Sequence, residues 1–175
     1  MNSNTEKNES GEFSEFQVNL NLLRDIDFFS GLPLDALKVF AYLCTQEVFM
    51  PGQYLFHQND DDGSAYYVIS GTTTLCYAEE TGEAEVRDYR EETFFGSLSI
   101  LTNMHRLFSL KAKTEVRCMV ISRQKFQKAI GQFPGLMPRI IKTIANRITR
   151  WEKQFILDHA GNWPDCRDHI GISLI

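Results

Sequence analysis

Apolar and polar positions along the chain follow two different periods, which divide it into segments. Between residues 20 and 44 the apolar residues recur at helical spacing, and a Ser-Gly-Leu-Pro break at 30–33 separates two expected helices. From residue 47 to residue 122, short runs rich in β-branched and aromatic residues are separated by turn residues such as Gly52 and Gly71. Regularly spaced short strands of this kind predict a sandwich or a barrel.

The expected strands cover residues 47–50, 54–57, 65–70, 72–78, 84–89, 106–112 and 116–122. Helical spacing returns after Arg123, with a short helix that ends near Gly131 and Pro134 and a long one over 136–159. Apolar residues of the long helix alternate in steps of four and three, namely Met137, Ile141, Ile144, Ile148, Trp151 and Phe155. This stripe predicts a homodimer, because a monomer would leave large side chains exposed.

These patterns divide the chain into five parts. We expect a disordered tail at 1–15, helices at 16–46, a β domain at 47–122, helices at 123–159 and a second tail at 160–175. The first tail is polar and has almost no apolar residues to bury. A length of 175 residues with 43% apolar content suits one core with appendages.

Charge and cysteine content exclude several classes of protein. A net charge of −5 offers DNA or an anionic membrane no overall attraction. No apolar run approaches the roughly 20 residues of a membrane span, and the polar start lacks the core of a signal peptide, so we expect a cytoplasmic protein. Reduced thiols and no zinc site are expected, because no CxxC pair occurs among Cys44, Cys76, Cys118 and Cys166.

Residues 95–107 contain a glycine that opens a short helical turn and a single arginine ten residues later. Phe95, Gly96, Leu98 and Arg106 match in register the pattern Phe-Gly-Glu-Leu-Ala-Leu, five residues, then Arg and a small residue. The segment thereby resembles the phosphate-binding cassette of the cyclic-nucleotide-binding domain family, which includes the sensor domain of catabolite activator protein and protein kinase A regulatory subunits. Ser97 replaces the glutamate of this pattern, and Leu107 replaces its small residue.

The resemblance covers about residues 28–150 and implies a mainly β fold, an eight-stranded jelly roll with flanking helices. It also implies a cyclic-nucleotide ligand whose phosphate is held by Arg106, Gly96, Ser97, Leu98 and Leu107. A guanidinium fork and backbone N–H groups suit a phosphate because they neutralise its charge with fixed geometry. Polar candidates for contacts to the base lie on the long helix, at Thr143, Asn146 and Arg147.

The family's glutamate takes the ribose hydroxyl, and Ser97 offers only a shorter, uncharged group. Loss of one charge-assisted hydrogen bond costs about 1.5–3 kcal/mol, which weakens binding of cyclic AMP or cyclic GMP by about tenfold to over a hundredfold. The same change makes the pocket more attractive to other small anions.

Two functions stay open. The chain is either a stand-alone regulatory sensor that relays ligand binding through its last helix, or an interaction module that keeps the fold without a ligand because Leu107 and Phe108 fill the pocket. We find no catalytic constellation, and Asp60-Asp61-Asp62-Gly63 lacks the distal glutamate of a calcium loop and indicates a turn. Residues 160–175 are too few for a winged helix-turn-helix, so DNA binding is not expected.

Overall fold

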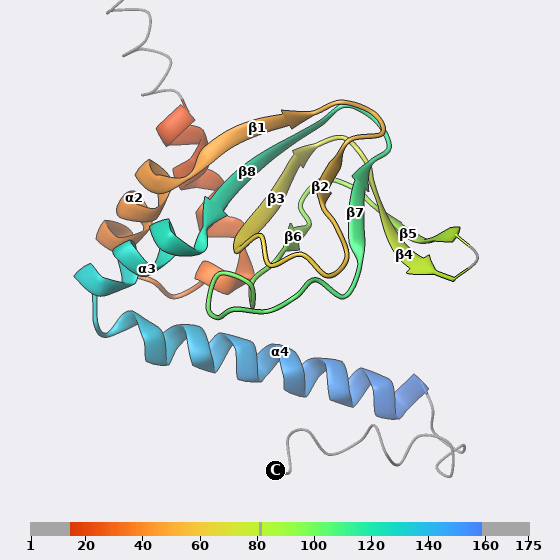
Figure 1. The fold of residues 1–175 in the computed structure, drawn as a ribbon. Helices are drawn as coiled ribbons and strands as arrows, with labels where there is room; N and C mark the ends of the chain where they lie inside the picture. Colours follow the sequence, from red (N-terminus) through yellow and green to blue (C-terminus); the bar gives the residue numbers. More distant parts are fainter. Residues whose placement is uncertain (1–14, 81, 159–175) are drawn as a thin grey trace, which may run out of the picture.

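The computed structural model describes residues 15–80 and 82–158, so the expected C-terminal tail lies outside it and the N-terminal one does so up to residue 14. A first helix spans 15–25 and is followed by η1 (Asp27–Phe29) and α2 (Leu34–Leu43). Figure 1 shows these helices at one end of a β roll, with α3 (Arg123–Gln132) beside them and α4 (Leu136–Asp158) running beneath the roll. In this part of the chain, no helix combines the length and apolar character that a membrane crossing requires.

Within the described residues the strands form two antiparallel, four-stranded sheets. The first has the order β1-β8-β3-β6, made of Thr45–Phe49, Val116–Ser122, Ser64–Ser70 and Phe94–Phe95. The second has the order β2-β7-β4-β5, made of Tyr54–Phe56, Ser109–Ala112, Thr73–Glu79 and Gly82–Tyr89. This arrangement confirms the predicted eight-stranded β fold with flanking helices.

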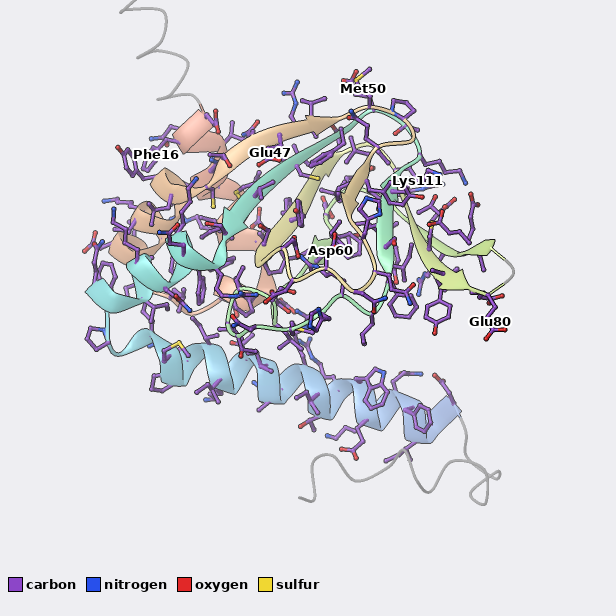
Figure 2. The ribbon with its side chains drawn as sticks, viewed as in Figure 1. Phe16, Glu47, Met50, Asp60, Glu80 and Lys111 are labelled. Carbon is purple, nitrogen blue, oxygen red and sulfur yellow. The ribbon has the colours of Figure 1, made fainter. Side chains whose placement is uncertain are left out.

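The predicted strand at 106–112 is wrong at its start, since β7 begins only at Ser109. Arg106 instead binds the loop that follows β2, in which Figure 2 labels Asp60. Its backbone N–H donates to the Asp60 carbonyl at 2.9 Å, and its own carbonyl accepts from the Asn59 N–H at 2.8 Å. Periodicity also missed β6, because two residues are too short to show an alternation.

Both faces of the central strands β3 and β8 are buried, each in a different core. Tyr66 and Val68 point into the roll, where they pack with Leu110 and Val116. Their neighbours on β3, among them Tyr67, face the helices instead. That second core contains a cluster of rings whose centroids are 5.0–6.0 Å apart, formed by Phe28, Phe29, Phe40, Phe94 and Phe126. The site described below therefore sits on strands fixed from both sides.

The apolar stripe predicted on α4 divides between two environments. Ile144 packs against the helical core of its own domain, next to the buried Ile140. Ile141 and Trp151 are 58% and 50% exposed, and the Trp151 ring stacks on that of Phe155 at 5.5 Å. An exposed apolar stripe is left along α4, and the homodimer stays a prediction.

Candidate functional site

A cavity of about 240 Å³ opens where the end of the roll meets the segment between β6 and β7. It brings together the residues predicted to hold a phosphate: Gly96, Ser97, Leu98, Arg106 and Leu107. Apolar side chains complete its wall, among them Phe56, Leu75, Phe95 and Phe108. A buried cation beside a glycine turn and an apolar wall is an arrangement that can bind an organic anion.

Arg106 is the central charged group of this cavity, with only 6% of its surface exposed. Its Nε donates to Asp62 Oδ1 at 2.7 Å, and its Nη2 donates both to Asp62 Oδ2 at 2.9 Å and to the Ser64 carbonyl at 2.5 Å. The guanidinium also lies 3.9 Å from the centre of the Phe56 ring. The arginine is therefore held by a two-pronged ion pair and a cation–π contact.

One nitrogen of the same guanidinium is left for a ligand. Nη1 of Arg106 has no hydrogen-bond partner among the described residues, and it lies 2.8 Å from the position that a Cβ on Gly96 would occupy. Gly96 has a φ of +80°, and the same Cβ would stand 2.4 Å from the Ser64 carbonyl oxygen. Only glycine fits there, and its lack of a side chain keeps Nη1 accessible.

The segment after Gly96 forms the expected short turn, which has hydrogen bonds of helical spacing but is not a regular helix. The N–H of Ile100 donates to the Gly96 carbonyl at 3.4 Å, and those of Leu101 and Thr102 donate to the Leu98 carbonyl at 3.0 and 3.2 Å. Ser97 is half-buried, and Leu98 is 47% exposed at the mouth of the cavity.

The acidic run after β2 supplies ion-pair partners for two arginines. The sequence analysis did not predict these ion pairs. Asp62 forms an ion pair with Arg106, and Asp61 forms a short ion pair with Nη2 of Arg123. Arg123 also donates from Nε to the Ser99 carbonyl and from Nη1 to Asn103 Oδ1, both at 2.7 Å. It thereby ties the turn to the acidic loop at the first residue of α3. The signal available in the sequence was the acidic run Asp60-Asp61-Asp62 itself, whose carboxylates can pair with arginines.

These hydrogen bonds and ion pairs shift the pKa values of two groups beside the cavity. The hydrogen bond from Arg123 lowers the pKa of Asp61 below its usual value. Tyr66 donates to Asp62 Oδ2 at 3.0 Å, and burial together with the negative charge of Asp62 raises the pKa of Tyr66. Asp62 therefore accepts from both the guanidinium and a hydroxyl that stays protonated.

Leu107 does not fill the pocket, since 71% of its surface is exposed. Phe108 lines the cavity wall and packs against Tyr77 with ring centroids 5.7 Å apart. The cavity is consequently open, although small.

Three predicted base-contacting residues lie outside this cavity. Thr143 and Asn146 line a separate polar cavity with Asp27 and Ser30, and Arg147 lines a third cavity near the first helix. The structure does not bring them together with Arg106, because α4 packs mainly on η1 in this arrangement.

Comparisons with known proteins identify the family and the fold of the chain. The profile of the cyclic nucleotide-binding domain matches residues 46–133. A cAMP-dependent protein kinase regulatory subunit of Hypocrea atroviridis is 30% identical over 128 residues, which cover 73% of this chain and 27% of that protein. The chain spans about a quarter to a third of the first curated relatives, with shares of 27%, 32% and 28%.

Solved structures share the fold. The N-terminal domain of a transcriptional regulator from Streptomyces coelicolor A3(2) superposes with a TM-score of 0.66 at 21% identity, covering 74% of this chain and 93% of that one. A regulatory subunit of a cAMP-independent protein kinase A from Trypanosoma cruzi, bound to guanosine, gives 0.63 at 21% identity and covers 84% and 50%. The fold is thus that of an eight-stranded jelly-roll domain with flanking helices. The chain belongs to the cyclic nucleotide-binding domain family.

Proposed function

We propose that this chain is a non-catalytic regulatory module that binds a cyclic nucleotide, or a related ligand with one phosphate, in the cavity around Arg106. The observation that carries the proposal is the unpaired Nη1 of a buried guanidinium, directed at the glycine turn of an open cavity. Its two N–H groups suit the equatorial oxygens of a phosphate monoanion. The cAMP-dependent regulatory subunit among its relatives supports a cyclic nucleotide as ligand.

Binding is expected to be weaker than a full cassette would give. Asp62 already neutralises Arg106, so a phosphate gains less from the charge than it would from a free guanidinium. Ser97 supplies no carboxylate for a ribose hydroxyl. Both features favour a ligand whose apolar body, packed on Phe56 and Phe95, contributes much of the affinity.

The module would relay ligand binding through the helices at the end of the roll. Arg123 contacts both the turn that forms the cavity and the acidic loop that holds Arg106. As the first residue of α3, it connects the site with the helices that lead to α4. A shift of the turn on binding therefore reaches α3 through a direct hydrogen bond.

A second candidate function is a dimerisation module without a ligand. It is favoured by the size of the cavity, about 240 Å³, because small-molecule sites usually measure about 300–1,000 Å³. Both oxygens of Asp62 accept hydrogen bonds from Arg106, so the guanidinium is held in place without a ligand.

Isothermal titration calorimetry with cyclic AMP and cyclic GMP separates the two. We expect saturable binding that weakens at least about tenfold in Arg106→Lys, which keeps the charge and loses the fork. Arg117→Lys, on the exposed face of β8, is the matched control and should bind like the parent chain. Absence of saturable heat with either nucleotide, for a folded protein, would favour the ligand-free module.

A further inference from the structure

The cavity near the first helix, which Arg147 lines, has a volume of about 710 Å³ and lies between that helix, β3 and the loop before β6. The carboxylates of Asp25, Asp27, Glu91 and Glu92 line it together with Tyr67, and we call it the acidic groove. It shares none of its lining residues with the Arg106 cavity. The acidic groove is therefore distinct from the cavity proposed to bind a nucleotide.

Most of the negative charge in the acidic groove is uncompensated. Asp25, Glu91 and Glu92 are exposed and form no ion pair with any residue that the structure describes. Asp27 pairs with Arg150 at 3.2 Å, and Arg147 of α4 lines the groove without pairing to a carboxylate within 4.0 Å. The rim therefore attracts cations.

Tyr67 provides a second, independent feature of the acidic groove. Its side chain is buried, with 6% of the residue exposed, yet its hydroxyl has no hydrogen-bond partner among the described residues. Every fully enclosed side-chain oxygen among the described residues has a hydrogen-bond partner. Because the Tyr67 hydroxyl has none, it is not enclosed, and it is accessible from the groove that Tyr67 lines. Burial, and then the charges of Glu92 and Asp25, raise the pKa of Tyr67. The groove thus contains an uncharged oxygen that is free to accept a hydrogen bond.

The walls beside Tyr67 are apolar. Ile26 and Phe28 are buried under the groove, and the half-buried Ile69 and Phe94 line it from β3 and β6. An apolar wall beneath an acidic rim suits a ligand that carries both a cation and an aliphatic or aromatic body.

We propose that the acidic groove binds a basic segment of a partner protein, with an arginine or lysine side chain at Tyr67 and an apolar side chain against Ile69 and Phe94. Guanidinium and ammonium groups only donate hydrogen bonds, which suits the carboxylates and the unpaired hydroxyl. A metal ion fits poorly, because no three His, Cys, Asp or Glu side chains among the described residues are arranged to ligate one. The volume of about 710 Å³ admits several side chains of a peptide.

Arg147 regulates access to the acidic groove. As a cation on the rim of the groove, Arg147 repels a basic segment and compensates part of the negative charge of the carboxylates. It also places α4 at the groove, so the orientation of that helix affects binding of the partner.

NMR titration of the full chain with an acetylated, amidated hexapeptide of Leu, Arg and Lys tests the proposal. We expect amide shifts centred on Tyr67, Glu92 and Phe94, and none with a matched peptide in which Glu replaces the basic residues. A third peptide, in which Gly replaces each Leu and the basic residues are kept, should bind at least about tenfold more weakly, since it leaves the apolar wall uncovered.

Variants give the sign of each contribution. Asp25→Asn combined with Glu92→Gln should weaken peptide binding by about tenfold or more, and Tyr67→Phe by several-fold, while Arg147→Gln should strengthen it. Tyr42→Phe, at a residue 80% exposed on α2, is the control. Shifts elsewhere on the protein, unchanged affinity in the double variant, or equally tight binding of the peptide with Gly in place of Leu would overturn the proposal. Cyclic-nucleotide affinity measured on the same variants is expected to stay unchanged, which separates this test from that of the Arg106 cavity.

Discussion

At the scale of single residues, Asp62 determines how Arg106 can be used. Two of the guanidinium nitrogens are occupied by Asp62 and the Ser64 carbonyl, and the third faces Gly96. A ligand must therefore bind to an arginine that is already partly neutralised. The pair keeps the cation in place at the expense of its attraction for anions.

Asp62→Asn should shift this balance towards the ligand. The substitution removes the carboxylate charge from Arg106, so the affinity for cyclic AMP should rise by about tenfold, while the free energy of unfolding falls by about 1–3 kcal/mol. Calorimetry and urea denaturation measure the two effects. Weaker binding in this variant would show that Asp62 orients the guanidinium for the ligand and does not compete with it.

Gly96→Ala should damage the fold and the cavity together. The new Cβ would lie 2.4 Å from the Ser64 carbonyl oxygen at a φ of +80°. We expect a loss of about 2–3 kcal/mol in the free energy of unfolding. Gly131→Ala is the matched control, because a Cβ there meets nothing within 4 Å and alanine favours the helix. Equal stability of the two variants would contradict the geometry at Gly96.

At the scale of elements, Arg123 couples the acidic loop to the turn and to α3. Because Arg123 lowers the pKa of Asp61, their pair stabilises the protein above the unfolded pKa of about 3.9 and is lost as pH falls through the lower folded value. Below about pH 4, the melting temperature of the parent chain should fall more steeply than that of Asp61→Asn.

Arg123→Gln is the control for this pH effect. It removes the largest cause of the lowered pKa of Asp61, so adding Asp61→Asn to it should change the melting temperature below about pH 4 much less than adding Asp61→Asn to the parent chain does. An equally large change in both cases would mean that groups other than Arg123 lower the pKa of Asp61.

Strands and helices were predictable from the sequence because their cores impose clear periods. β3 and β8 bury both faces, which gives near-continuous apolar runs, and α4 shows its stripe plainly. The start of β7 was not predictable, because Arg106 bonds through its backbone to a loop remote in sequence. The Asp62 partner was missed for the same reason: local patterns carry no information on which loop meets which side chain.

At the scale of the whole molecule, α4 presents an exposed apolar stripe that a second copy would cover. We predict a dimer by sedimentation velocity and a monomer for Ile148→Asp, since a charge at the centre of a buried interface is strongly unfavourable. Leu157→Asp, on the opposite side of the same helix and 69% exposed, should stay dimeric. A parent chain that is monomeric at all concentrations would contradict the interface.

The central claim is that the Arg106 cavity recognises a phosphate through the free Nη1. The most direct measurement compares the affinities of cyclic AMP and adenosine in the parent chain and in Arg106→Lys. We expect cyclic AMP to bind at least about tenfold more tightly than adenosine in the parent chain, and this preference to disappear in the variant. An equal preference for cyclic AMP in both proteins, or no preference in the parent chain, would contradict the claim.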